Sequence, residues 1–277
     1  MPKLTLGEVV LGYDADGGSG DPTVLVHGSW VDRRSWGRMR PLLSQGLDVV
    51  SYDRRGHGES QGPPRRRPVR DDAEDLAELL RSVDRYPAHV VGHSYGGAVA
   101  LRLAIDQPEL VRSVALHEPP FLGLLDDAEG PLRAAGADVR AAVEAIRAQV
   151  HAGDPAGAAR QFVTRFSSDP TAWDRIDPDA RERFVRYADR WAEEIGDPEA
   201  TAPSRGALQE LDLPVLITTG ERSPALFPAI ERALAGCLRN ATCRTLAGAG
   251  HLPQLTDPAV YAGALVTFLL ERDVPST

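Results

Sequence analysis

Six short runs of β-forming residues, several of them apolar throughout, alternate with segments of helical pattern along this chain. The runs occupy residues 23–28, 47–53, 88–94, 110–118, 213–221 and 242–248. An uninterrupted apolar run is typical of a strand buried on both faces, as in a parallel sheet with helices on either side. Between two runs, apolar residues at 73, 76, 79, 80 and 83 follow the spacing of one helix face. The alternation predicts an α/β fold with a doubly wound, mostly parallel sheet, and segment 4–17 predicts an antiparallel hairpin at one edge.

One long segment interrupts the alternation. From about Phe121 to Arg205 the sequence shows helical patterns, punctuated by Pro and Gly, and no convincing strand. A helical block inserted between two strands of one sheet is expected to cover the sheet's carboxyl edge, where open α/β sheets bind ligands. We therefore predict a core domain made of residues 1–120 and 206–277, and an all-helical cap made of residues 121–205.

The charge balance excludes some classes of partner. The 277-residue chain has 31 Lys and Arg against 40 Asp and Glu, a net charge of −9, which disfavours binding to a phosphate backbone. The basic run 63–70 is expected to be a solvated loop. The two cysteines form no zinc motif, and no apolar stretch is long enough to span a bilayer. We expect a cytoplasmic protein that binds a small molecule, with no nucleic acid, membrane, cofactor or metal; the oligomeric state cannot be read from the sequence.

The segment GHSYG at residues 92–96 follows one apolar run and precedes a helical pattern. A serine on such a tight strand-to-helix turn has strained backbone angles, and the positions two residues away must be small to avoid collision. The segment fits the pattern G-x-S-x-G in the strand–turn–helix context that this pattern requires. We predict that Ser94 is a nucleophile.

Other positions fit the needs of a serine nucleophile. The Tyr95 N–H lies at the start of the predicted helix, and the Ser29 N–H follows Gly28 in the loop after an earlier strand, so both can hold an oxyanion. Of the seven histidines, His251 stands between a strand end and the final helix, where the base follows the serine in this arrangement. We predict His251 as the base and Trp30 as a residue of the substrate pocket.

Together these motifs resemble the α/β-hydrolase fold in its form with a helical cap. The matching segments are HGSW (27–30), YDRRGHGES (52–60), GHSYGG (92–97), HEPP (117–120), LPVLITTGE (213–221) and GAGH (248–251). They run in the family's order and span residues 23–270, nearly the whole chain. The resemblance is specific for the fold and much less specific for the substrate. It also implies that segment 52–60 borders the mouth of the active site, and we expect a structural role for its glycines and His57.

The chain departs from the commoner family pattern at the acid that orients the histidine. Relatives usually carry an Asp shortly after the penultimate strand, where this chain has Ser223. Two candidates remain: Glu118, which ends an earlier strand, and Glu221, which directly follows the penultimate strand. Some relatives, including certain haloalkane dehalogenases, carry the acid at the earlier position. We favour Glu118 over Glu221, and the absence of an assisting acid is a third alternative.

The predicted function is hydrolysis of a carboxylic ester or lactone through an acyl-enzyme, with Ser94, His251 and an acid as catalytic residues. A carbon–carbon bond hydrolase or a lyase on the same fold is the alternative among enzymes, and a binding or accessory protein with weak turnover is the alternative outside them. We expect a medium-sized, mostly apolar acyl substrate. The side chains of the predicted cap that we expect to line its pocket are Phe121, Leu122, Leu125, Phe162, Phe166, Trp173 and Trp191.

Overall fold

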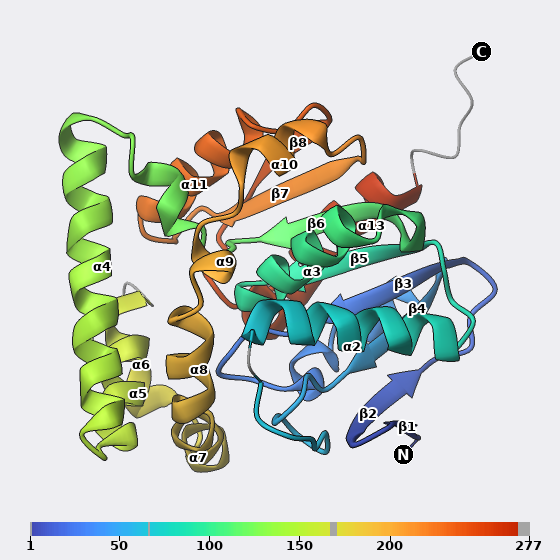
Figure 1. Ribbon diagram of the computed structural model, residues 1–277, viewed down its shortest axis with the longest axis horizontal. Helices are drawn as coiled ribbons and strands as arrows, with labels where there is room; N and C mark the ends of the chain where they lie inside the picture. Colours follow the sequence, from blue (N-terminus) through green and yellow to red (C-terminus); the bar gives the residue numbers. More distant parts are fainter. Residues whose placement is uncertain (1, 66, 167–170, 271–277) are drawn as a thin grey trace.

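The computed structural model describes residues 2–65, 67–166 and 171–270. Its centre is an eight-stranded sheet in the order β1-β2-β4-β3-β5-β6-β7-β8 (Figure 1). The strands are β1 (Lys3–Leu6), β2 (Val9–Ala15), β3 (Asp21–Val26), β4 (Leu47–Tyr52), β5 (Ala88–His93), β6 (Val111–His117), β7 (Val215–Gly220) and β8 (Ala241–Leu246). The β1–β2 and β2–β4 pairs are antiparallel, and the other neighbours are parallel. This confirms the predicted mostly parallel sheet with a hairpin at one edge.

Helices cover both faces of the sheet. Helices α2 (Pro68–Ser82) and α3 (Tyr95–Asp106) pack on one face, and α1 (Arg40–Leu43) and α13 (Pro258–Leu270) pack on the other (Figure 1). Successive side chains of a strand point to opposite faces. Within β5, Val90 therefore joins the hydrophobic cluster of α2 and α3, while Val91 joins the cluster of α13. Because both faces are buried, the central strands are apolar at consecutive positions.

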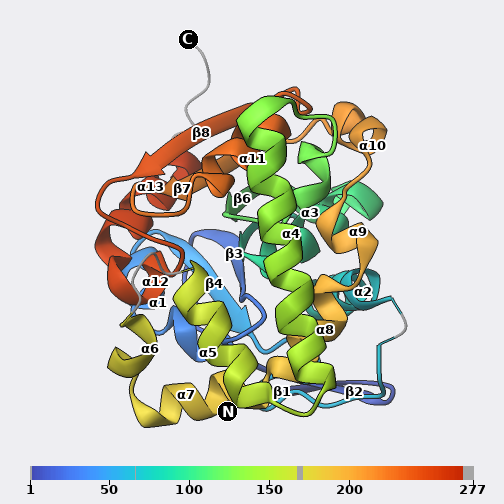
Figure 2. The same ribbon diagram turned by 90° about the vertical axis from the view of Figure 1, so that its left-hand side faces the viewer.

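The segment between β6 and β7 contains helices and no strand among its described residues. After a 3-10 turn, η3 (Leu122–Leu125), come α4 (Gly130–His151), α5 (Pro155–Phe166), α6 (Ala172–Arg175), α7 (Pro178–Arg186), α8 (Ala188–Ile195) and α9 (Pro198–Thr201), and α10 (Arg205–Glu210) leads into β7. Figures 1 and 2 show α4, α5 and α8 over the end of the sheet toward which β6 points. This insertion fits the predicted cap, whose limits at 121 and 205 stay a prediction. Of the described helices, none is both long and apolar enough to cross a membrane.

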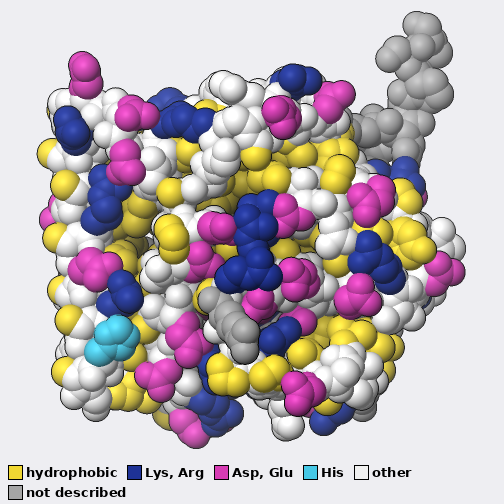
Figure 3. Space-filling view, viewed as in Figure 1, with side chains coloured by type: hydrophobic (Ala, Val, Ile, Leu, Met, Phe, Trp, Pro, Cys, Tyr) yellow, Lys and Arg dark blue, Asp and Glu magenta, His cyan; other side chains and the backbone are white. Residues whose placement is uncertain are grey.

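The basic run at residues 63–70 is not simply the solvated loop that the sequence predicts. The Arg65 side chain is only 1% exposed and pairs with Asp72 and Glu194, while Arg70 pairs with Glu199 on α9. The prediction is wrong for Arg65, because the buried carboxylates of Asp72 and Glu194 pair with it. It is wrong for Arg70 because this residue lies on α2 and pairs with the exposed Glu199. Figure 3 shows the same balance on one face, where basic side chains stand among acidic ones. Arg65 and Arg70 therefore link the core to α8 and α9, while residue 66 of this run lies outside the described residues.

Candidate active site

Ser94 occupies the turn between β5 and α3. Its backbone angles, φ 52° and ψ −123°, lie in a region that non-glycine residues rarely adopt. The two flanking glycines allow this turn to pack closely. A Cβ on Gly96 would lie 2.3 Å from the Val26 carbonyl oxygen, and one on Gly92 would lie 2.4 Å from the Gly96 carbonyl oxygen. The turn thus presents Ser94, which is partly exposed, to a cavity above the sheet.

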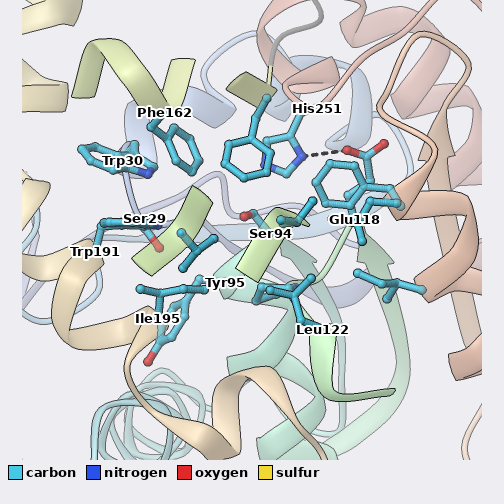
Figure 4. A pocket seen from close by; sticks show the side chains of 17 residues that line it. Ser29, Trp30, Ser94, Tyr95, Glu118, Leu122, Phe162, Trp191, Ile195 and His251 are labelled. Carbon is cyan, nitrogen blue, oxygen red and sulfur yellow. Dashed lines mark hydrogen bonds and ion pairs between the residues drawn. The ribbon is translucent and has the colours of Figure 1, made fainter. Parts of the chain in front are cut away.

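His251 enters the same cavity from the loop after β8 (Figure 4). Its Nδ1 lies 2.7 Å from Oε2 of Glu118, the residue that directly follows β6. The other carboxylate oxygen of Glu118 accepts a hydrogen bond of 2.7 Å from the Gly220 N–H at the end of β7. Glu118 also has a positive φ of 46°, so the backbone is held in an uncommon conformation where the carboxylate meets the histidine.

Glu118 is ionised at neutral pH although it is buried. Burial opposes the ionised form, but His117, His251 and the Gly220 N–H lower the pKa of Glu118 to about 2. A carboxylate bonded to Nδ1 fixes the tautomer of the ring and leaves Nε2 as the nitrogen able to accept a proton.

The alternative acid, Glu221, has a different environment. It is exposed, and its carboxylate accepts a hydrogen bond of 2.7 Å from the Gly248 N–H. Of the two carboxylates that the sequence offers, Glu118 is the one hydrogen-bonded to His251. The structure therefore brings Ser94, His251 and Glu118 together at the carboxyl edge of the sheet.

Two further histidines support the loop that carries His251, and sequence reasoning missed this role. The Nε2–H of His93 donates to the His251 carbonyl at 2.7 Å, and Nε2 of His117 lies 3.3 Å from the Gly250 carbonyl. Burial lowers the pKa of His117 to about 4 and that of His93 well below its usual range, so both rings are neutral at pH 7. Within the described residues, no group of His, Cys, Asp and Glu side chains is arranged to hold a metal ion.

The two predicted oxyanion donors both border the cavity. Tyr95 is the first residue of α3, so its N–H has no intrahelical acceptor. Ser29 lies in the loop after β3, which approaches Ser94 closely because residue 28 is a glycine. A Cβ on Gly28 would lie 3.2 Å from the Ser94 Cβ and 2.8 Å from Nδ1 of His93.

The cavity is lined mainly by apolar side chains and encloses about 580 Å³, including its opening. The predicted pocket residues Trp30, Leu122 and Phe162 line it, and Figure 4 shows them around Ser94 and His251. Phe166 and Trp191 also line it. The sequence did not reveal the other apolar residues of the lining, which are Pro120, Val139, Val143, Ile195, Leu226, Phe227 and Ile230. Of these, Phe227 on α11 (Leu226–Ala235) stacks its ring on His251, with centroids 4.9 Å apart.

Three predicted pocket residues lie elsewhere. Phe121 and Leu125 are each 1% exposed and pack in the hydrophobic core, because the turn at η3 directs Leu122 rather than its neighbours toward the cavity. Trp173 on α6 packs edge-on against Phe184. These side chains support the walls of the insertion and do not line the cavity that contains Ser94.

A second cavity of about 1130 Å³, including its opening, adjoins the first. Phe162, Phe166 and His251 line both. Its remaining walls come from the insertion, for example Phe184, and from the loops after β7 and β8, where the charged side chains Arg222 and Asp257 line it. The histidine therefore stands between two largely apolar cavities, of which the second also has charged side chains in its walls.

Comparison with known proteins agrees with this architecture. A protein from Caulobacter vibrioides described as "Putative carbamate hydrolase RutD" is 28% identical over 97% of this chain and 99% of its own length. The enol-lactonase of Burkholderia xenovorans LB400 superposes with a TM-score of 0.79 at 22% identity, over 97% of this chain and 100% of its own. The dihydrolipoyllysine-residue acetyltransferase component of the acetoin cleaving system of Pseudomonas putida is 36% identical over 117 residues, which are 42% of this chain and only 32% of that protein.

The family model for the alpha/beta hydrolase family matches residues 23–264, most of the chain. Most of β3, all of β4 to β8, the serine turn after β5 and the histidine loop after β8 fall within this match, whereas β1 and β2 lie before it. The chain therefore belongs to the alpha/beta hydrolase family, and hydrolase is the class of enzyme that this membership supports.

Proposed function

We propose that this protein is a serine hydrolase that cleaves a carboxylic ester or lactone through an acyl-enzyme. The observation that carries the proposal is the grouping of Ser94, on its strained turn, with a histidine held by an ionised, buried carboxylate in one apolar cavity. An activated nucleophile needs an adjacent base, and the base needs a third group that orients it.

The proposed reaction follows from this geometry. Ser94 Oγ attacks the substrate carbonyl carbon while His251 Nε2 takes the serine proton, and Glu118 stabilises the imidazolium. The N–H groups of Ser29 and Tyr95 hold the oxyanion. When the carbon–oxygen bond of the ester breaks, His251 returns the proton to the leaving alcohol. A water molecule, deprotonated by His251, then releases the acid and restores Ser94.

The lining of the first cavity supports an apolar acyl group of medium size. Among the described residues that line it, Glu118 is the only Asp, Glu, Lys or Arg, and it is already bonded to His251 and Gly220. The lining therefore favours an uncharged acyl chain. The alcohol part is assigned to the second cavity, whose walls include Arg222, Ser223 and Asp257. Both cysteines are free thiols, which supports the expected cytoplasmic location.

The test compares the wild type with Ser94→Ala on p-nitrophenyl esters of increasing acyl length and on simple lactones, with labelling by a fluorophosphonate as a readout that does not depend on the substrate. We expect turnover and labelling in the wild type, and neither in the variant. A wild type without labelling contradicts the proposal and favours a binding protein. Strong labelling without ester or lactone turnover favours a carbon–carbon bond hydrolase or a lyase.

A further inference from the structure

The guanidinium group of Arg54 forms hydrogen bonds with the loop that carries Ser29. Nε of Arg54 donates to the His27 carbonyl at 3.0 Å, and its Nη2 donates to the Gly28 carbonyl at 3.2 Å. The Arg54 backbone N–H donates to Nε2 of His27 at 2.9 Å. Two consecutive carbonyls before Ser29 thus accept from the same side chain. Together with the 2.7 Å bond from Nδ1–H of His27 to the Gly28 carbonyl, this side chain sets the direction of the peptide that bears the Ser29 N–H.

The same guanidinium also contacts the side chain of Tyr95, the residue whose backbone N–H is the second predicted oxyanion donor. The Arg54 carbon between the guanidinium nitrogens lies 4.6 Å from the centre of the Tyr95 ring. A planar guanidinium can stack on an aromatic ring while its N–H groups bond in the plane. Arg54 therefore bonds the carbonyl of the peptide that bears the Ser29 N–H and stacks on the ring of Tyr95, although it does not line the cavity itself.

Arg54 is held in place by buried carboxylates. Its Nη1 donates to Asp72 at 2.7 Å and to Glu194 at 2.6 Å. The side chains of Arg54, Asp72 and Glu194 are all fully buried. Burial opposes a charge on Arg54, but Glu194 and Asp72 raise its pKa above the usual range, so Arg54 is a permanent cation.

We propose that Arg54 is a positioning residue that aligns the Ser29 and Tyr95 N–H groups on the oxyanion; the inference rests on the proposed serine hydrolase function. The fork of a guanidinium can bond two carbonyls and two carboxylates at once, whereas a lysine ammonium has three donors at one point. Small displacements of groups that stabilise a transition state cost large factors in rate. For segment 52–60 we expected a structural role of the glycines and His57. The proposal adds a specific role for Arg54 of this segment, which is to position the oxyanion donors.

The chain provides a matched control in Arg65. Its side chain is equally buried, and it donates to the same two carboxylates, Asp72 at 2.8 Å and Glu194 at 3.1 Å. None of these bonds made by Arg65 reaches the loop of residues 27–29; the one contact of the cluster with Ser29, a hydrogen bond from its side chain to Glu194, is common to both arginines. Loss of the Arg65 fork should therefore disturb the buried ion cluster to a similar degree without displacing the oxyanion donors.

The experiment compares Arg54→Lys with Arg65→Lys. Thermal unfolding, kcat and KM on the best p-nitrophenyl ester, and inhibition by a trifluoromethyl ketone, whose hemiketal carries an oxyanion, are measured for each. We expect Arg54→Lys to lower kcat by about 10- to 100-fold with little change in KM, and to weaken the inhibitor by a similar factor. Arg65→Lys should keep kcat and inhibition near the wild-type values, even where its unfolding temperature falls as far.

Equal losses of kcat in the two variants would overturn the inference, because they would reflect general destabilisation. If Arg54→Lys does not fold, the double variants Arg54→Met/Glu194→Met and Arg65→Met/Glu194→Met replace the pair, since each removes one cation with one anion. We again expect a much lower kcat in the double variant that lacks Arg54 than in the one that lacks Arg65. Equal kcat values in the two double variants would contradict the inference. If Ser94→Ala hydrolyses the ester as fast as the wild type, the proposed function itself is refuted. This outcome differs from a failure of the inference about Arg54, in which Ser94→Ala is inactive but the two arginine variants lose the same kcat.

Discussion

At the scale of single residues, the chemistry depends on which carboxylate orients His251. We predict that Glu118→Gln lowers kcat by about 10²- to 10⁴-fold, because an amide can hold the ring in the wrong tautomer and cannot stabilise the imidazolium. Glu221→Gln is the matched control, since Glu221 bonds the Gly248 N–H rather than the histidine. Ester hydrolysis by folded samples measures both. A larger loss in Glu221→Gln than in Glu118→Gln would contradict the assignment.

The low pKa of Glu118 also predicts how stability depends on pH. The pKa of about 2 in the folded protein lies below the ordinary value of 4.5, so between these values the unfolded chain binds more protons than the folded one. The ionised Glu118 therefore contributes stability above about pH 4.5, of the order of 3 kcal/mol, which is lost as the pH falls toward 2.

Urea unfolding of the wild type and of Glu118→Gln between about pH 5 and pH 2 measures this contribution. The wild type should lose more free energy of unfolding than the variant over this range, because the amide does not titrate. Parallel curves for the two proteins would show that Glu118 has no depressed pKa.

Ser94, His251 and Glu118 could be placed from the sequence because Ser94 and Glu118 directly follow strands and His251 stands in the loop after the last strand. The carboxyl ends of parallel strands meet at one edge of the sheet. His93 and Arg54 could not be assigned in this way. Their partners are backbone carbonyls of segments distant in sequence, such as that of His251, 158 positions from His93. No spacing or periodicity encodes such a bond, so its existence depends on the folded loops.

At the scale of elements, the strands were predictable and the cavity wall only partly so. Burial on both faces makes consecutive positions of a central strand apolar, as at Val24, Leu25 and Val26 of β3, so composition alone marks the strand. In the turn at η3, by contrast, Leu122 faces the cavity while Leu125 packs in the core. Both are leucines, and only the packing of the surrounding helices decides between them.

At the same scale, Phe162 on α5 should limit the size of the acyl group that the cavity accepts. Its ring lies 4.8 Å from Trp30 and 5.7 Å from Trp191, centroid to centroid, and lines the cavity. We predict that Phe162→Ala raises kcat/KM for long or branched acyl esters relative to acetate by about 10-fold, because the added space accepts extra methylene groups. Phe121→Leu, away from the cavity, should leave this ratio unchanged. Equal ratios in both variants would refute the role of Phe162.

At the scale of the whole molecule, ion pairs join the helical insertion to the core in two different environments. Glu194 on α8 is fully buried against Arg54 and Arg65, and Arg54 lies 140 positions away in sequence. Glu199 on α9 pairs with Arg70, where the side chains are 42% and 30% exposed. The buried contact excludes water and cannot be replaced by solvent, whereas the exposed one can be.

We therefore predict that removal of the two glutamates lowers the free energy of unfolding by unequal amounts. Glu194→Ala should lower the free energy of unfolding by about 3–5 kcal/mol, because it leaves two buried arginines with Asp72 as their one buried carboxylate partner among the described residues, beside the exposed Glu193. Glu199→Ala should lower it by less than about 1 kcal/mol, because water solvates Arg70 in place of the lost partner. Urea unfolding followed by tryptophan fluorescence and circular dichroism measures both, since Trp30 and Trp191 meet where the insertion covers the core. Equal losses of free energy in the two variants would mean that apolar contacts alone hold the insertion on the core. Glu194 would then contribute to the position of the active-site loops and not to the packing of α8 on the core.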